Sequence, residues 1–201
     1  VKAALEILLA EDGPNFSNRH VTVSTSGIVP EMRRFGEETD VKLAVSLNAT
    51  TDEVRSALMP LNRKWPLREL LAACRDFPMK KGRRITFEYV LLGEVNDTDE
   101  DAHRLARLVK GIPAKVNLIP YNENPGLGFR APSPFRVEAF LGILLRANVT
   151  AVVRRNRGRD IAAACGQLAA EGGPGDPRRR PPRGEGAGPG TASLTGRGSA
   201  G

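Results

Sequence analysis

Five segments of the chain end in clusters of hydroxyl, amide and carboxylate side chains that could hold a polar small molecule. Each cluster follows a short run of β-branched residues, which is typical of a strand. Such groups fix a ligand through directed hydrogen bonds, although Ser, Asn and Gly also end strands for structural reasons. Five clusters in one chain favour a site. They lie at 24–27, 46–50, 88–97, 120–126 and 154–158.

The last cluster contains Arg154, Arg155 and Arg157, and Arg159 follows it, which gives four arginines within six residues. Guanidinium groups this close together repel one another unless an anion lies between them. An RNA phosphate backbone would be such an anion, and a solvated surface is the equally weighted alternative. We take Arg154, Arg155 and Arg157 as candidate RNA-binding residues.

The chain has two cysteines, which are too few for a disulfide-dense scaffold or a four-cysteine zinc site. Cys165 lies among alanines and next to Gly166. It is therefore either a small buried hydrophobic residue or a thiol that another group can approach. Cys74, which follows two alanines in a helical pattern, is expected in the core.

Strand and helix patterns alternate along 1–171, which predicts a parallel sheet with crossover helices. The pattern over 134–147 should turn Val137, Phe140, Leu141, Leu144 and Leu145 toward the core. The expected strands are 20–24, 41–47, 84–91, 115–120 and 149–153, and the expected helices are 2–10, 29–36, 51–58, 66–75, 98–109, 134–147 and 159–170.

Both doubly wound sheets and barrels are built from this alternation. No Gly-x-Gly-x-x-Gly follows the first strand, and no phosphate-loop motif is present, which weakens the doubly wound alternative. We therefore predict an α/β fold that is a partial (β/α) barrel. In barrels the chemistry takes place at the carboxyl ends of the strands, where the polar clusters fall.

The composition is that of an ordinary folded domain, with 40% hydrophobic residues, 26% charged residues and a net charge of +7. No apolar run approaches the roughly 20 residues of a membrane span, and no secretory leader opens the chain. A cytoplasmic protein without a membrane partner is expected. Residues 172–201 are rich in Gly, Pro and Arg and should form a disordered tail, either simply solvated or touching phosphates, after a folded region over 1–171.

Four sequence motifs stand in a fixed order along the folded region. They are VTVSTSGIVP at 21–30, AVSLNA at 44–49, NLIPYN at 117–122 and RGRDIAAACGQLA at 157–169. Together they closely resemble the radical-SAM RNA adenine-C2 methyltransferases, the RlmN class. The resemblance implies a radical-SAM partial barrel, a [4Fe-4S] cluster, S-adenosylmethionine (SAM), an electron donor, a monomer, and 23S rRNA and tRNA as substrates.

The resemblance also implies roles for single residues. Cys165 matches the cysteine that carries the methyl group. Adenine C2 is electron-poor, so in this family a thiolate first takes the methyl group from SAM. A radical from a second SAM then activates that methyl group, and a second cysteine releases the product through a disulfide. The positions that match SAM contacts are Ser24, Ser46, Leu47, Asn48 and Asn122.

The chain departs from the family pattern in several places. The cluster motif Cys-x-x-x-Cys-x-x-Cys, a Gly-Glu stretch and the second cysteine are missing, and we expect them before Val1. Asn48 stands where histidine is common, and Ala162 where aspartate is common. The chain is thus interpreted as the C-terminal part of such an enzyme, inactive by itself and without metal ligands. The alternatives are a catalytically inactive basic RNA-binding fragment and an unrelated barrel enzyme.

Overall fold

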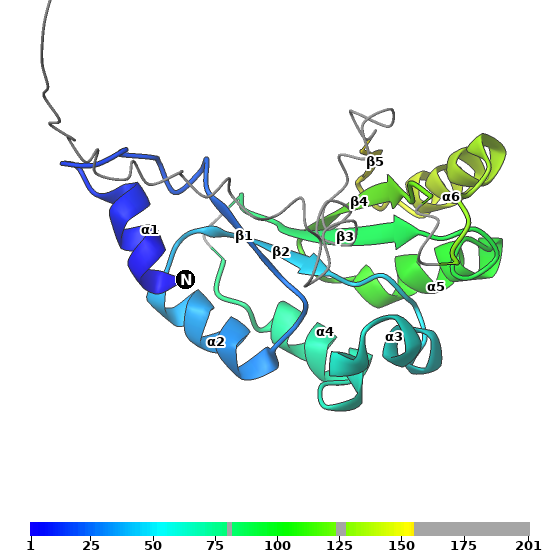
Figure 1. Ribbon diagram of the computed structural model, residues 1–201, viewed down its shortest axis with the longest axis horizontal. Coiled ribbons are helices and arrows are strands. Elements are labelled where there is room, and N and C mark those ends of the chain that lie inside the picture. Colours follow the sequence, from blue (N-terminus) through cyan, green and yellow to red (C-terminus); the bar gives the residue numbers. More distant parts are fainter. Residues whose placement is uncertain (80–81, 124–127, 155–201) are drawn as a thin grey trace, which may run out of the picture.

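The computed structural model describes residues 1–79, 82–123 and 128–154 (Figure 1). Each strand and helix expected before residue 155 is present, with bounds that differ by a few residues at most. The expected helix 159–170 and the tail 172–201 lie outside the described residues. The elements are α1 (Lys2–Leu9), β1 (Thr22–Thr25), α2 (Val29–Glu38), β2 (Lys42–Ser46), α3 (Asp52–Leu58), the 3-10 helix η1 (Pro60–Arg63), α4 (Leu67–Arg75), β3 (Ile85–Leu91), α5 (Asp99–Val109), β4 (Ala114–Pro120), α6 (Pro134–Arg146) and β5 (Ala151–Val153).

The strands form one five-stranded parallel sheet in the order β1-β2-β3-β4-β5. Strands that follow one another in sequence are therefore neighbours in the sheet, and the sheet winds in a single direction. A doubly wound sheet reverses its strand order at a switch point, whereas the wall of a barrel does not. The strand order thus matches the predicted partial barrel.

The two faces of the sheet have different surroundings. In β3 the side chains of Ile85, Phe87, Tyr89 and Leu91 are wholly buried, and the residues between them are partly exposed. This alternation follows from the two-residue period of a strand. Helices α2, α4, α3 and α5 follow one side of the strands (Figure 1). The apolar face packs on these helices, and the other face is free of described helices.

One detail of the predicted core was wrong. Leu145 of α6 is 51% exposed, whereas Ile143, which was not expected in the core, is 5% exposed. The buried stripe of α6 runs through Val137, Phe140 and Leu144, with spacings of three and four residues. Leu145 lies about 100° further round the helix than Leu144, and its side chain points to solvent.

No helix among the described residues is long and apolar enough to cross a membrane.

A buried carboxylate joins the loop after β2 to the start of α5. Asp101 accepts hydrogen bonds at 2.6 Å from the hydroxyls of Thr50 and Thr98 and from Nη2 of Arg104. Burial opposes ionisation of this carboxyl group, but these three hydrogen bonds and the charge of Arg104 outweigh it, so that the pKa of Asp101 is lowered. The folded state therefore favours the ionised carboxylate.

Replacing Asp101 with asparagine should lower the free energy of unfolding by about 2 kcal/mol at pH 7, because charged hydrogen bonds are lost and an amide N–H₂ meets other donors. Since the folded pKa is depressed, the carboxylate stabilises the protein above the unfolded pKa of about 4. That stabilisation is lost as the pH falls through the folded value. Urea unfolding of both proteins should therefore give a smaller difference at pH 3 than at pH 7.

The matched control is Asp99→Asn, which changes an exposed carboxylate of the same helix that pairs with Arg136 at 2.9 Å. An exposed pair of this kind contributes roughly 0–1 kcal/mol. A difference for Asp101→Asn that is the same at both pH values, or no larger than that for Asp99→Asn, would contradict the role given to Asp101.

Candidate functional site

A row of polar side chains crosses the face of the sheet that the described helices leave free. The parallel register places Ser46 of β2 beside Glu88 of β3 and Glu88 beside Asn117 of β4. All three are half-buried. Ser24 of β1 pairs with Ala44, two residues before Ser46, and therefore lies on the same face. We call this surface the open face.

Asn48 is held at the carboxyl end of β2 by its own side chain. Its backbone is in the left-handed region, with φ of 58°, which asparagine adopts more readily than most residues. Its Oδ1 accepts a hydrogen bond from the backbone N of Val90 at 3.0 Å, and its Nδ2 donates to Sδ of Met59 at 3.4 Å. The side chain thus links β2 to β3, and it keeps one N–H for a ligand.

Leu47 offers no free polar group to a ligand. Its side chain is wholly buried. Its backbone N donates to the carbonyl of Glu88 at 2.9 Å, and its carbonyl accepts from Ala49 N at 2.8 Å and from Nε of Arg55 at 3.0 Å. A contact of Leu47 with SAM, as the family resemblance implies, would therefore be one of shape and not of hydrogen bonding.

The end of β4 carries an unsatisfied hydroxyl next to Asn122. Within the described part of the chain, the hydroxyl of Tyr121 is the one buried side-chain polar atom without a hydrogen-bond partner. Its ring packs edge-on against Phe129, with the ring centroids 6.2 Å apart. Buried hydroxyls usually have a partner, so this one has a hydrogen-bonding capacity that the described residues leave unused.

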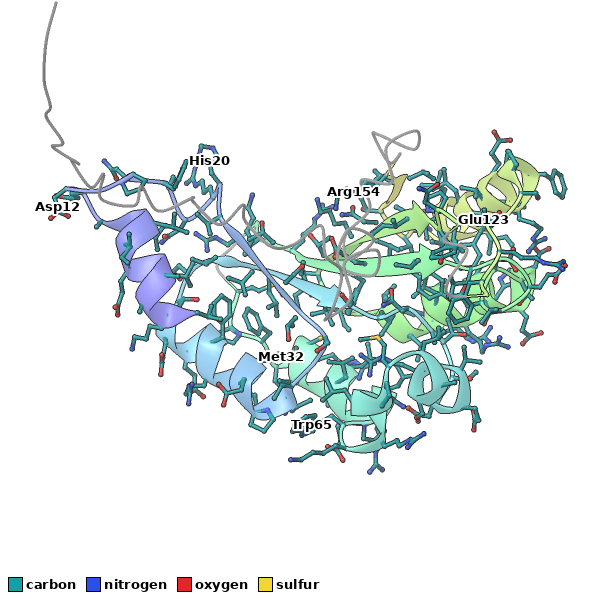
Figure 2. The ribbon with its side chains drawn as sticks, viewed as in Figure 1. Asp12, His20, Met32, Trp65, Glu123 and Arg154 are labelled. Atoms are coloured by element: carbon teal, nitrogen blue, oxygen red, sulfur yellow. The ribbon has the colours of Figure 1, made fainter. Side chains whose placement is uncertain are left out.

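Arg154 reaches the open face from the end of β5. Its backbone N donates to the carbonyl of Leu118 at 2.8 Å, and its Nη1 lies 3.9 Å from Oε1 of Glu88. In Figure 2 it lies on the side of the strands away from Met32 and Trp65, which mark the helical side. The side chain of Arg154 is 66% exposed, so this ion pair is weak and an anion can compete for the arginine.

The other sequence-predicted site residues have no described position. Cys165, Arg155 and Arg157 lie outside the described residues, as do Arg159 and Ala162. Their roles stay predictions. Among residues 1–79, 82–123 and 128–154, no group of three His, Cys, Asp or Glu side chains could hold a metal ion.

Cys74 is a core residue, as predicted. Its side chain is wholly buried in α4, and its thiol is free. Burial raises the pKa of this thiol to about 12, although Arg75 and Arg55 oppose the shift. Cys74 is therefore protonated at neutral pH and is a poor nucleophile.

Three buried polar residues next to the site were missed by the sequence analysis: Arg55, Asn62 and Asn96. Nothing in residue type or spacing distinguishes Arg55 from Arg63 and Arg68, which are exposed. Asn96 falls within the polar cluster at 88–97, so its neighbourhood was predicted, but its burial was not.

Curated proteins match almost the whole chain. A protein of Anaeromyxobacter dehalogenans (strain 2CP-C) named dual-specificity RNA methyltransferase RlmN is 77% identical over 180 residues, which are 90% of this chain and 48% of that protein. A protein of the same name from Geobacter sulfurreducens is 58% identical over 165 residues, which are 82% of this chain and 46% of that protein. A scan of family models found no match.

Solved structures share the fold. The crystal structure of a radical SAM methyltransferase from Sphaerobacter thermophilus is 52% identical with a TM-score of 0.77, and the match covers 81% of this chain and 48% of that one. A domain of pyruvate-formate lyase-activating enzyme from Bacteroides vulgatus ATCC 8482 is 14% identical with a TM-score of 0.54, covering 67% of this chain and 80% of that one, and is alike in fold alone. The predicted radical-SAM type of α/β fold is thus confirmed.

The chain spans about half the length of the curated relatives it matches. Its high identity over nearly its whole length agrees with the four motifs and with the strand order. The chain therefore belongs to the RlmN family of radical-SAM methyltransferases.

Proposed function

We propose that the full-length protein containing this chain methylates C2 of adenine in 23S rRNA and tRNA through a methyl group carried on Cys165. The observation that carries this proposal is the position of the residues that match SAM contacts. Ser24 and Ser46 lie on the open face, and Asn48 and Asn122 stand at the carboxyl ends of two strands of the same sheet. Their order along the chain and their place in the sheet both fit one binding site.

The chemistry of the open face suits SAM. Serine hydroxyls and asparagine amides can donate to and accept from ribose hydroxyls, an adenine ring and an amino-acid end. The unpartnered hydroxyl of Tyr121 adds a further group at the same edge. The described residues contain no ligand set for an iron–sulfur cluster, so we assign its ligands to no residue of this chain and derive no step through it.

Cys165 would do the covalent work. Its thiol loses its proton to solvent, and the thiolate attacks the methyl carbon of SAM. A sulfur–carbon bond forms on the cysteine while the methyl–sulfonium bond of SAM breaks, releasing S-adenosylhomocysteine. A radical from a second SAM would take one hydrogen atom from this S-methyl group, so that the remaining carbon radical could add to an electron-poor carbon.

The arginines at the end of β5 would bind the RNA. Arg154 lies exposed beside the open face, and Arg155 and Arg157 follow it in sequence. Neutralising phosphates with arginine favours binding without sequence preference. An external electron donor, a monomeric state and a cytoplasmic location complete the proposal.

The test is methyl transfer from SAM whose methyl group carries three deuteriums, using the full-length protein with its cluster reconstituted and an RNA fragment as substrate. Transfer through an activated S-methyl group should leave two deuteriums in the methyl group on adenine and place one in 5′-deoxyadenosine. Mass spectrometry of both products measures this. A product that keeps three deuteriums, or no methylated adenine, would overturn the proposal. The alternative of an inactive RNA-binding fragment predicts RNA binding without any product, and it is not favoured because the relatives are named as methyltransferases.

A further inference from the structure

Arg55 of α3 is a charged side chain in the core beneath the proposed SAM site. Arg55 is wholly buried, which is rare for an arginine. Its Nε donates to the carbonyl of Leu47 at 3.0 Å, and its Nη2 donates to the carbonyls of Ser26 at 2.8 Å and Ser46 at 3.1 Å. Its Nη1 donates to Oδ1 of Asn62 at 2.9 Å. Four of its five N–H groups are thus used.

Three of the four acceptors are backbone carbonyls at the carboxyl ends of two neighbouring strands. Ser26 follows β1, Ser46 ends β2, and Leu47 follows β2. Carbonyls that leave a strand end have no partner in the sheet, and a buried one without any partner is costly. One planar guanidinium satisfies all three and thereby fixes the distance between the two loops.

Asn62 fixes the guanidinium in turn. Its Nδ2 donates to Oδ1 and the carbonyl of Asp52, at 2.9 and 3.2 Å, and lies 2.9 Å from Oγ of Ser56. The same Oδ1 of Asp52 accepts from the backbone N of Leu67 at 2.8 Å. Arg55 is therefore held in one orientation by the start of α3, by η1 and by the start of α4.

The loop after β1 is shaped to lie against this arginine. Gly27 has φ of +106°, a conformation that favours glycine. A Cβ on Gly27 would stand 2.9 Å from Cδ1 of Leu70 and 3.4 Å from Nη2 of Arg55. The tight contact is with Leu70, and the positive φ of Gly27 thus lets this loop pack on Leu70 beside the guanidinium.

We propose that Arg55 is a positioning residue for SAM binding, which never touches SAM but fixes the two strand ends that carry Ser24 and the stretch 46–48. This inference rests on the proposed function, because it takes those residues as the SAM contacts. The contacts of Leu47 support it: its carbonyl is bonded to Arg55 and its N–H to β3, so the peptide before Asn48 cannot shift without breaking one of these hydrogen bonds.

The test is Arg55→Lys in the full-length protein with its cluster in place. Lysine keeps the positive charge, but its compact ammonium group has three donors. It cannot reach the four acceptors that the planar guanidinium of arginine contacts. We expect SAM to bind about tenfold more weakly, with KM for SAM raised and kcat at saturating SAM changed by less than about threefold. Hydrogen exchange of the amides in 24–28 and 46–50 should be faster.

Arg136→Lys is the matched control. Arg136 also donates hydrogen bonds to the backbone: its Nε and Nη2 both donate to the carbonyl of Asp97, at 3.2 and 2.5 Å. It contacts neither β1 nor β2, so its replacement should leave SAM affinity unchanged. Wild-type SAM affinity in Arg55→Lys, or an equal loss in Arg136→Lys, would overturn the role of Arg55 alone. An unaltered protein that binds no SAM would overturn the proposed function, and the role of Arg55 with it.

Discussion

Replacing Cys165 with alanine in the full-length protein should reduce methyl transfer to RNA by roughly a thousandfold or more, as losing a covalent nucleophile does in other enzymes. The physical reason is that a methyl group cannot be carried by alanine. The chain offers one other thiol, Cys74, which is wholly buried and has a pKa of about 12. It therefore cannot take over the role. The measurement is methylated adenine in the RNA, determined by mass spectrometry.

The chain supplies its own control for this experiment. Cys74→Ala should retain methyl transfer and lower the free energy of unfolding by about 1–2 kcal/mol, because it removes a small apolar group from a packed core. Normal methylation by Cys165→Ala would show that another group carries the methyl. Loss of transfer in a well-folded Cys74→Ala protein would show that the wrong cysteine had been chosen.

The architecture could be predicted because it depends on periodicity, which a sequence displays directly. The strand Ile85–Leu91 alternates buried and partly exposed residues throughout, as its β-branched and aromatic residues indicate. The predicted helices 51–58 and 98–109 both begin at a threonine, a residue favoured at helix N-caps, and Thr51 and Thr98 accept hydrogen bonds from Val54 N and Asp101 N. Even so, the position of Leu145 was predicted wrongly. The apolar stripe in the sequence of this helix is broader than the face of the helix that packs against the core.

The candidate site was predictable only in part. Strand ends meet at one edge of a parallel sheet, so the polar residues that follow strands could be grouped before their positions were known. The sequence could not show which of these polar groups are free. The side-chain oxygen of Asn48 is bonded to Val90, and Leu47 has no polar group to spare. Whether a polar group is already hydrogen-bonded depends on contacts between elements, and the spacing of residues along the chain does not show these contacts.

Buried polar residues were the largest omission, and the cause is physical. Arg and Asn are mostly exposed in folded proteins, so residue type favours the wrong answer for Arg55 and Asn96. Each is buried because it satisfies backbone groups that irregular loops leave without partners. Whether the backbone groups of a loop need a side chain as partner depends on the path of the loop in three dimensions. The local sequence does not determine that path.

A second large effect, on the free energy of unfolding, is expected when Asn96 is replaced. Asn96 is wholly buried, and its Oδ1 accepts from the backbone N of Leu92 at 2.7 Å. Its Nδ2 donates to the carbonyls of Asn48 and Val90, each at 2.8 Å. The side chain thus joins the ends of β2 and β3 to the loop before α5.

Asn96→Ala should lower the free energy of unfolding by about 3–4 kcal/mol, because one N–H and two carbonyls then lose their partner in a buried loop. Urea unfolding measures the loss. The control is Asn117→Ala, which removes the same side chain from the half-buried open face and should cost less than about 1 kcal/mol. Equal losses would mean that the hydrogen bonds of Asn96 contribute nothing specific.

The Asn96→Ala variant also tests which hydrogen bonds hold the carboxyl end of β2 in place. Arg55 binds the carbonyl of Leu47 from the helical side, and Asn96 binds the next carbonyl, that of Asn48, from the loop after β3. If both restraints place Asn48 for SAM, Asn96→Ala should weaken SAM binding under conditions where it remains folded, as Arg55→Lys does. If SAM affinity fell only in Arg55→Lys, the carbonyl of Leu47 would be the restraint that matters, and Asn96 would serve stability alone.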